Sequence, residues 1–271
     1  MTDMQKLIKY LAIAFAVFLI VCIFTGILTA ATAITGIFRS VESNTSHAMQ
    51  SFSVSADIAE LEINIGAAEL IITNGEQFSL SSNLKDLKVE QRNGCLTLKE
   101  PLQFGKNYNG AVIQLTVPED HVFGKLSISS GAGKLQADTL ATQSLALNLG
   151  AGQAIFRDLT AHGSAMISTG AGELQIKAGA LSNLDLDMGV GKVTLCSRLT
   201  GENEINQGIG EAELILFGVK EDYRVHIDKG VGNAFVDGTP AASDTKYGNG
   251  PAEVEIDGGI GTIRVSFSKQ K

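Results

Sequence analysis

Oxygen-bearing residues recur at matching positions of neighbouring sequence repeats in the C-terminal half. They are Asp185 and Asp187, then Glu204 and Asn206 one repeat later, then Asp228 in the following repeat. On one strand, Asp185 and Asp187 would point to the same face about 7 Å apart. Oxygen ligands at this spacing could hold a calcium ion, and two carboxylates at that distance also suit an inverting glycosidase.

A solvated polar face explains the same residues without any ligand. The column two residues before a recurring glycine holds only Asn, Ser or Asp: Asn64, Ser129, Asn148, Ser168, Asp187, Asn206, Asp228 and Asp257. Catalysis would require a buried carboxyl group with a raised pKa, whereas this column is expected to be exposed. We therefore assign no catalytic, cofactor-binding or metal-binding residue, and a cation site at Asp185, Asp187, Glu204 and Asp228 stays an open alternative.

Several glycine-rich segments imitate nucleotide or calcium loops. Residues 131–134 and 189–192 both read Gly-x-Gly-Lys, but a phosphate loop around Lys192 would need glycine at 186 and Ser or Thr at 193. Those positions hold Leu186 and Val193, so turns of a repeat are the better interpretation. Residues 258–261 resemble a calcium-binding nonapeptide, but Ile263 replaces its aspartate.

The histidines and cysteines form no recognisable site in the sequence. The histidines lack metal-ligand spacing: His47, His121, His162 and His226. Cys22 lies in an apolar block, while Cys95 and Cys196 are far apart in the chain. A Cys95–Cys196 disulfide is one alternative, and buried free thiols are the favoured one.

The element that must position these residues is an internal repeat. Two alternating apolar residues precede a Gly-small-Gly turn and two more follow it. The first glycine of each copy is Gly66, Gly131, Gly150, Gly170, Gly189, Gly208, Gly230 or Gly259. The spacing is about 19 to 20 residues from Gly131 to Gly208 and longer thereafter.

Alternation indicates strands, and so short a period predicts an all-β, single-stranded β-solenoid with coils of about 19–20 residues. Apolar residues three before, four after and six after the first glycine are expected to point inward. The residue between the glycines is also expected to point inward, as are Leu140, Leu159, Leu181 and Leu199 at a second corner. Glycine at the turn permits positive φ and close backbone approach. Residues 73–125 are read as two or three degenerate coils.

The outward position three residues after the glycine carries charges that alternate between coils. It holds Lys134, Gln153, Glu173, Lys192 and Glu211 in successive copies. The alternation avoids a ladder of like charges, although each exposed pair contributes only about 0–1 kcal/mol. At the end of the chain, Lys269 and Lys271 are expected to protect the last edge from self-association.

The N-terminal region predicts a membrane anchor. Residues 10–38 carry no charge and are long enough for a transmembrane helix. Lys6 and Lys9 precede this block and Arg39 follows it, which favours a cytoplasmic N-terminus and an extracytoplasmic C-terminal domain. The predicted organisation is therefore residues 1–9 in the cytoplasm, 10–38 in the membrane, 39–56 as a linker and 57–268 as the solenoid.

Two processing alternatives remain for the anchor. Ala31, Thr32 and Ala33 form an A-x-A signal-peptidase site, although the apolar run before them is long for a signal peptide. Residues 19–22 faintly resemble a lipoprotein box ending at Cys22, but valine precedes the cysteine where a small residue is needed. An uncleaved single-pass anchor is the favoured interpretation.

The composition excludes some partners. The net charge is −8, which disfavours nucleic acid because binding to it depends on Lys and Arg neutralising phosphates. With 30 glycines, 4 prolines and 18% charged residues, the chain is typical of short strands and tight turns rather than of disorder.

The Gly-Ala-Gly turns, the run at residues 112–118 ahead of residues 126–133, and the N-terminal apolar segment together resemble the bacterial putative-adhesin family. The resemblance covers residues 56–267 and implies a β-helical envelope domain of unknown function, without catalytic residues to carry over. "Adhesin" is itself an inference from shape.

Three functions compete at this point. The favoured one is a membrane-anchored binding or scaffold protein whose ligand is an envelope protein or a cell-wall component. A polysaccharide-acting enzyme is the second, although carbohydrate grooves favour aromatic platforms and the chain has no tryptophan. A self-assembling, membrane-associated scaffold on the cytoplasmic side is the third, and it needs the opposite topology.

Overall fold

A computed structural model describes residues 48–100 and 108–269, and this part of the chain is all-β, as the alternating pattern predicted. The first half contains strands β1 Gln50–Phe52, β2 Glu60–Ile65, β3 Glu69–Gly75, β4 Ser79–Ser82, β5 Lys88–Arg92, β6 Cys95–Lys99, β7 Val112–Pro118, β8 Val122–Ser130 and β9 Lys134–Ile176. The second half contains β10 Gly179–Ser182, β11 Leu184–Thr200, β12 Glu202–Phe217, β13 Tyr223–Asp228, β14 Val231–Val236, β15 Thr239–Ala241, β16 Thr245–Tyr247 and β17 Ala252–Ser268, with a 3-10 turn η1 at Lys220–Asp222.

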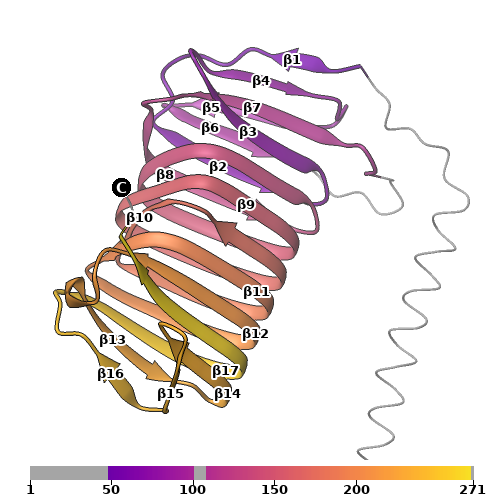
Figure 1. The fold of residues 1–271 in the computed structure, drawn as a ribbon. Helices are drawn as coiled ribbons and strands as arrows, with labels where there is room; N and C mark the ends of the chain where they lie inside the picture. The colour runs from indigo at the N-terminus through magenta and orange to yellow at the C-terminus, as the bar shows by residue number, and fades with distance from the viewer. Residues whose placement is uncertain (1–47, 101–107, 270–271) are drawn as a thin grey trace, which may run out of the picture. The chain divides into compact units, whose positions relative to one another are not determined.

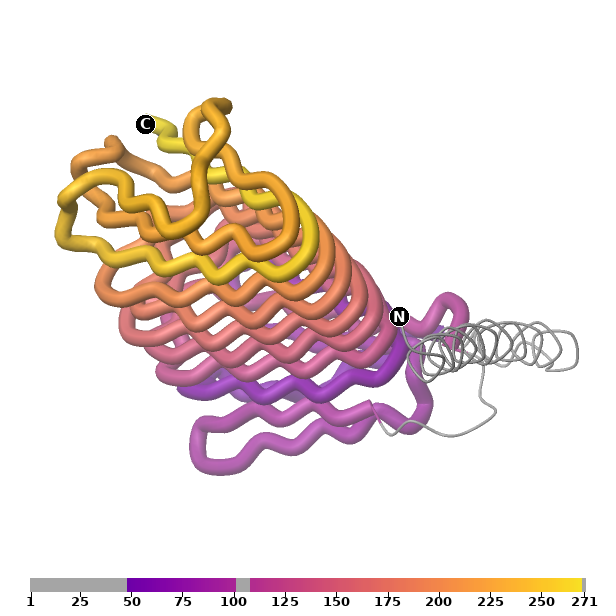
Figure 2. Tube along the Cα trace, turned by 90° about the horizontal axis from the view of Figure 1, so that it is seen from below, coloured from indigo at the N-terminus to yellow at the C-terminus, as the bar shows by residue number. Residues whose placement is uncertain are grey.

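The middle strands pair in parallel and in register, one repeat beside the next. Asp187 on β11 lies beside Ser168 on β9 and beside Asn206 on β12. Each repeat thus forms one layer, a turn of chain around a shared interior, and Figures 1 and 2 show these layers following one another. Parallel pairing of this kind aligns every column of the repeat along the stack.

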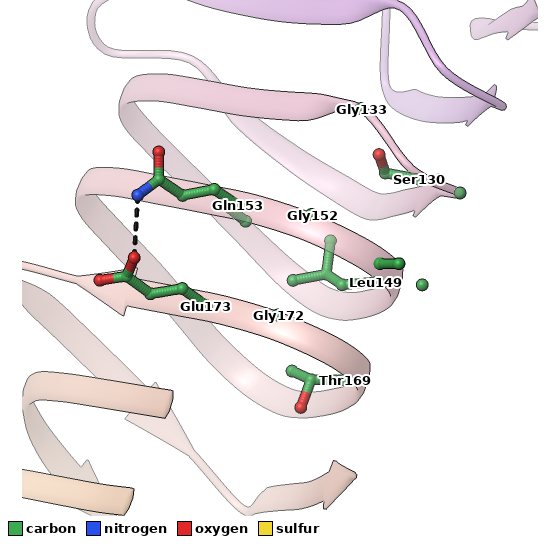
Figure 3. A pocket seen from close by; sticks show the side chains of 12 residues that line it. Ser130, Gly133, Leu149, Gly152, Gln153, Thr169, Gly172 and Glu173 are labelled. Carbon is green, nitrogen blue, oxygen red and sulfur yellow. Dashed lines mark hydrogen bonds between the residues drawn. The ribbon is translucent and has the colours of Figure 1, made fainter. Parts of the chain in front are cut away.

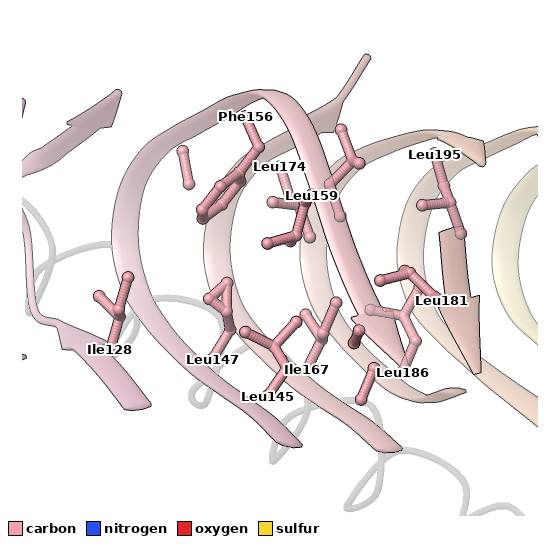
Figure 4. Packing of buried hydrophobic residues seen from close by; sticks show 14 of the residues in the cluster. Ile128, Leu145, Leu147, Phe156, Leu159, Ile167, Leu174, Leu181, Leu186 and Leu195 are labelled. Carbon is pink, nitrogen blue, oxygen red and sulfur yellow. The ribbon is translucent and has the colours of Figure 1, made fainter. Parts of the chain in front are cut away.

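The three predicted columns form a large part of the interior. Their members before the turn are all buried: Ile63, Ile128, Leu147, Ile167, Leu186, Ile205, Ile227 and Ile256. Those four and six residues after the first glycine are buried too: Leu70, Leu135, Ala154, Leu174, Val193, Ala212, Ala234, Ile263, Ile72, Ala137, Phe156, Ile176, Leu195, Leu214, Val236 and Val265. Figure 4 shows part of this core, in which Leu147, Phe156, Ile167 and Leu174 point into the space that the turns of chain enclose. Each buried Leu or Ile contributes roughly 1.5–3 kcal/mol.

The prediction for the residue between the two glycines was wrong. Val190 and Ile209 are about half exposed, at 53% and 50%, rather than buried. The inward residue before the turn and the first inward residue of the next strand are seven positions apart, as Leu186 and Val193 are, so the alternation must break at the corner. The break leaves the middle residue pointing outward. The second corner was predicted correctly, since Leu140, Leu159, Leu181 and Leu199 are buried.

The glycines themselves are required by close approach between layers. A Cβ on Gly191 or Gly210 would overlap the carbonyl oxygen of the equivalent glycine in the preceding layer. Both also have φ values, +141° and +135°, that favour glycine. The corner therefore needs glycine for space and for conformation.

The layers do not follow one another in chain order at the C-terminal end. β17 pairs with β12 on one side and with β13 and β14 on the other, so the last strand is inserted between earlier ones. Figure 1 shows β17 between β12 and β14. The segment 239–252, which lengthens the last repeat, carries β15 and β16 and returns the chain for this insertion.

A similar reversal occurs near the N-terminal end. β2 pairs with β6 and β8, while β3 pairs with β7 and β9. β6 and β7 thus supply one parallel layer beyond β2 and β3, rather than the two or three coils predicted for residues 73–125. The remaining strands of this segment are antiparallel, because β5 pairs with β6 and β4 pairs with β7.

Antiparallel strands cover the edges at both ends of the stack. At one end β4, β5 and β1 lie against β7, β6 and β4, and at the other end β16 and β15 lie against β13 and β14. Short antiparallel strands of this kind protect an edge from pairing with another chain. Lys269 follows β17, which lies inside the stack, so the protective role predicted for Lys269 at the last edge was misplaced. Lys271 lies outside the described residues.

The membrane and linker predictions fall largely on residues 1–47, outside the described part. Among the residues that the structure does describe, it contains no helix of the length and hydrophobicity needed to cross a bilayer. The proposed domain boundaries at 9, 38 and 56 stay predictions.

One histidine, His121 between β7 and β8, is expected to make the stability of the protein depend on pH. The His121 ring packs against Phe78 and Phe123 at centroid distances of 4.9 and 4.5 Å. Burial lowers the pKa of His121, although a backbone hydrogen bond with Ile58 acts in the opposite direction. The unfolded chain therefore takes up the proton first, at a pH of about 6.5.

We expect the unfolding midpoint of the protein to fall as the pH is lowered from about 7.5 to about 5.5, and His121→Phe to reduce this slope. The loss of stability should begin near the pKa of His121 in the unfolded chain and end below its lowered pKa in the folded protein. Thermal unfolding at several pH values measures it, with exposed His162→Gln as the control. Equal slopes for His121→Phe and the original protein would contradict the assignment.

Candidate functional site

The acidic residues identified in the sequence share one outward sheet face. Asp185 and Asp187 on β11 lie beside Glu204 and Asn206 on β12. The next neighbours are Glu255 and Asp257 of β17, and only then Asp228 of β13. The predicted adjacency of the Asn206 and Asp228 coils was therefore wrong, because β17 separates them. The sequence had no signal for this insertion.

The described contacts of these residues are hydrogen bonds within the surface. Asn206 Nδ2 donates to Asp187 Oδ1 at 3.1 Å and to Glu204 Oε1 at 3.0 Å. Ser243 Oγ donates to Asp228 Oδ1 at 2.6 Å. This bond, with a smaller contribution from the Gly230 backbone, lowers the pKa of the Asp228 carboxyl group.

Neither the cation site nor the glycosidase pair gains support from this geometry. Within residues 48–100 and 108–269, no group of three or more His, Cys, Asp or Glu side chains is arranged to hold a metal ion. Asp185 and Asp187 are exposed, which is not the apolar environment that would raise the pKa of a catalytic acid.

The histidines and cysteines are placed apart from one another. His226 bonds Asp244 at 2.8 Å and lies 3.7 Å from Glu255, and His162 is exposed. His47 lies outside the described residues. Cys95 and Cys196 are free, half-buried thiols, which favours the free-thiol interpretation. Burial, with a smaller effect of Glu213, raises the pKa of the Cys196 thiol.

The glycine turns are occupied by contacts between layers. The Ala132 amide donates to the Gly66 carbonyl oxygen, and the Ala151 amide donates to that of Gly131, each at 2.6 Å. Amides engaged in this way cannot also surround a phosphate, which supports the turn interpretation. Figure 3 shows the shallow hollow beside these turns, with Gln153 Nε2 donating to Glu173 Oε2 at 2.9 Å.

A buried carboxylate closes the corner between β2 and β3. Glu100 Oε2 accepts from the amides of Gly66, Ala67 and Ala68 at 2.8, 3.2 and 3.2 Å. This layer has Ala68 in place of the second glycine. Glu100 is only 7% exposed, and no pattern in the sequence indicated its role.

We expect Glu100→Ala to lower the free energy of unfolding by about 2–3 kcal/mol, because three amides lose a charged acceptor. Glu100→Gln should recover part of this, since its amide oxygen can still accept. The control is Glu62→Ala, which removes only an exposed pair with Lys99 at 3.6 Å. Denaturant unfolding measures both, and equal losses for the two alanine variants would contradict this role.

An exposed apolar ridge runs along the same stack, beside the acidic face. It consists of the corner residues Val190, Ile209, Ile260 and Val231, which are 53%, 50%, 54% and 71% exposed. Their pairing order is Val190, Ile209, Ile260, Val231, each beside the next. The sequence placed these side chains in the interior, so this surface was missed.

The two faces beside the ridge differ in charge pairing. After the turn, Lys192 lies 3.5 Å from Glu211 and 3.7 Å from Glu213, and Arg264 also pairs with Glu211. Before the turn, carboxylates occur in three neighbouring layers without a described ion pair: Asp185, Asp187, Glu202, Glu204 and Asp257. The ridge therefore separates an ion-paired face from an acidic face with excess charge.

Comparisons with known proteins give similarity at the level of solved structures. No family model matches the chain, and no curated protein matches it. It is similar to a putative adhesin from Bacteroides fragilis, at 12% identity and a TM-score of 0.44, covering 83% of this chain and 100% of that one. It is also similar to a putative cell adhesion protein from Clostridium sporogenes, at 16% identity and a TM-score of 0.37, covering 82% and 99%.

A third similar structure is described as a putative lipid binding protein from Parabacteroides distasonis, at 14% identity and a TM-score of 0.32, covering 83% of this chain and 98% of that one. The descriptions as adhesin and cell adhesion protein agree with the family resemblance of the Gly-Ala-Gly turns. At such low identities and TM-scores, none of the matches carries a ligand or an activity over to this chain.

Proposed function

We propose that this protein is a membrane-anchored, extracytoplasmic binding or scaffold protein without catalytic activity. Residues 10–38 would cross the membrane once, residues 39–56 would form a linker, and residues 57–268 would form the binding domain. The observation that carries the binding role is the ridge at Val190, Ile209, Ile260 and Val231, where aliphatic side chains stay exposed in register. Contiguous exposed apolar surface commonly marks an interaction site.

The architecture suited to this role is a β-solenoid. Its support is the in-register parallel pairing of equivalent repeat positions on β9, β11, β12 and β17. Each layer contacts mainly its neighbours, and the stack creates an extended surface on which a partner can bind several layers at once. The capped ends disfavour the alternative of a scaffold that grows end to end by edge pairing.

A polysaccharide-acting enzyme is the second candidate function, and its single motivation is the Asp185 and Asp187 pair. The double substitution Asp185→Asn with Asp187→Asn tests it on a panel of wall polysaccharides. Loss of a measured hydrolytic or lyase activity in this variant would favour the enzyme. Unchanged activity would exclude these two residues as its catalytic pair.

The experiment for the proposed function combines topology with partner capture. Protease added to intact cells should digest the domain of the full-length protein, whereas a protected domain would support the cytoplasmic scaffold instead. Crosslinking in intact cells, followed by purification, should then recover a defined envelope protein or wall component. Recovery must be reduced for Ile209→Ser, because this substitution changes only an exposed ridge side chain. The binding role would be contradicted if no partner were enriched and the original protein and Ile209→Ser recovered the same material.

A further inference from the structure

We infer that the ridge and the acidic face together bind a cationic amphipathic polypeptide segment, in which apolar side chains alternate with Lys or Arg. This inference rests on the proposed binding function and specifies its partner. The apolar part of the site is Val190, Ile209, Ile260 and Val231. The charged part is the acidic face before the turn, formed by the two outward columns that contain Asp185 and Asp187.

The apolar contribution comes from the regular spacing of the ridge. Parallel neighbours lie about 4.8 Å apart, so the aliphatic side chains form a continuous line rather than isolated contacts. The line becomes bulkier toward one end, because the equivalent residues of earlier layers are Ala132, Ala151 and Ala171. The valines and isoleucines thus concentrate apolar surface on the layers of β11, β12, β17 and β14.

The same layers carry the charge that selects the occupant. Asp185 lies beside Glu204, and Glu204 beside Glu255. Asp257 lies between Asn206 and Asp228. Basic side chains meet only part of this face in the described structure: the Arg224 guanidinium pairs with Glu253, and the His226 ring lies beside Glu255. Like charges in neighbouring strands repel one another, so a cationic partner would relieve repulsion as it binds.

Charge also argues against the other occupants of an apolar ridge. A second copy would bring its own acidic face against this one, and the chain carries a net charge of −8. An anionic lipid surface would be repelled for the same reason. A segment with alternating apolar and basic residues is complementary to both features, since one side covers the ridge and the other reaches the carboxylates.

The test uses the full-length protein in nanodiscs of phosphatidylcholine, which lacks net charge. The probe is a fluorescent peptide of alternating Leu and Lys, and binding is followed by anisotropy against empty nanodiscs. Two comparison peptides separate the contributions: alternating Leu and Glu keeps the apolar side, and alternating Ser and Lys keeps the charge. We expect only the Leu and Lys peptide to bind well, and added salt to weaken its binding.

Matched variants assign the binding to this surface. The ridge variant combines Val190→Ser, Ile209→Ser and Ile260→Ser. The charge variant combines Asp185→Asn, Asp187→Asn, Glu204→Gln and Asp257→Asn. The control variant neutralises as many exposed carboxylates elsewhere, through Glu60→Gln, Glu76→Gln, Glu119→Gln and Asp120→Asn. We expect each of the first two to weaken binding about tenfold or more, and the control to change it less than about twofold.

A charge reversal keeps the inference falsifiable if a neutral variant folds poorly. Asp187→Lys combined with Asp257→Lys should weaken binding of the Leu and Lys peptide and strengthen binding of the Leu and Glu peptide. The binding of a variant is interpreted only if its thermal unfolding midpoint matches that of the original protein.

Three results would overturn the inference. The first is equal binding of the Leu and Glu peptide and the Leu and Lys peptide to the protein. The second is equal peptide binding by the ridge variant and the control variant, and the third is dimerisation of the protein that the ridge variant abolishes. The last result would assign the ridge to a second copy. The proposed function is judged separately, because an envelope partner captured equally by the original protein and by the charge variant would retain that function and reject the cationic segment.

Discussion

Replacing Gly210 by alanine is expected to lower the free energy of unfolding by on the order of 4 kcal/mol. Two physical effects add at this position. The φ of +135° is one that an L-residue rarely adopts. The added Cβ would also overlap the carbonyl oxygen of Gly191 in the neighbouring layer, which is held there by the parallel ladder. Relief of the overlap requires the two layers to separate.

Substitutions at two other glycines separate the effect of the backbone conformation from the effect of the steric overlap. Gly238 has φ +74°, but no atom lies within 4 Å of the place that an alanine methyl group would take, so Gly238→Ala should cost only about 1 kcal/mol. Gly150 lacks a positive φ, yet its Cβ would overlap the Gly131 carbonyl oxygen, so Gly150→Ala should give an intermediate loss. Denaturant unfolding followed by circular dichroism measures all three. A loss for Gly210→Ala no larger than that for Gly238→Ala would contradict the close-approach explanation.

The second large effect is expected for Phe156→Ala, at about 3–5 kcal/mol. Phe156 is fully buried in the column six residues after the glycine, among leucines of the neighbouring layers (Figure 4). Removal of the ring leaves a cavity that the hydrogen-bonded layers cannot close. Because each layer is stabilised mainly by its neighbours, a weak middle layer should also reduce cooperativity. The unfolding transition of this variant should therefore broaden or divide.

Phe235→Ala provides the control for the size of the ring. Phe235 is only half-buried, and its ring lies 5.8 Å from the Arg264 guanidinium. Its loss should cost about 1 kcal/mol and leave a single transition. Scanning calorimetry on both variants distinguishes the cases. If Phe156→Ala and Phe235→Ala lowered stability equally, the middle layer would not have the central role described.

These predictions bear on function because the turn glycines position the ridge. Gly208 and Gly210 flank Ile209, and their close approach to Gly189 and Gly191 keeps Ile209 beside Val190. A substitution that separates these layers should also separate the aliphatic side chains. Peptide binding and stability should thus be lost together in Gly210→Ala, whereas the ridge variant should lose binding alone. This difference separates a structural residue from one that contacts the partner.

The inward columns of the fold were determined by the sequence alone. Residues such as Ile167, Leu186 and Ile205 recur with the repeat, and side-chain alternation along a strand is a local property that fixes which face is buried. The glycine turn was equally local. The sequence also placed Asp185 and Asp187 correctly on an exposed face, since their apolar neighbours had to be inside.

Only the tertiary structure decided how the layers are ordered and what the corner exposes. Ile227 and Ile256 occupy the same column and are equally apolar, so no pattern indicates that β17 lies between β12 and β13. Strand pairing is a contact between distant segments, and it alone brings Asp257 beside Asn206. The orientation of Ile209 was undetermined for a related reason: the alternation must break within the turn, and the backbone geometry of Gly208 and Gly210 selects where. That selection turns an expected core residue into part of the exposed ridge that we propose as the binding surface.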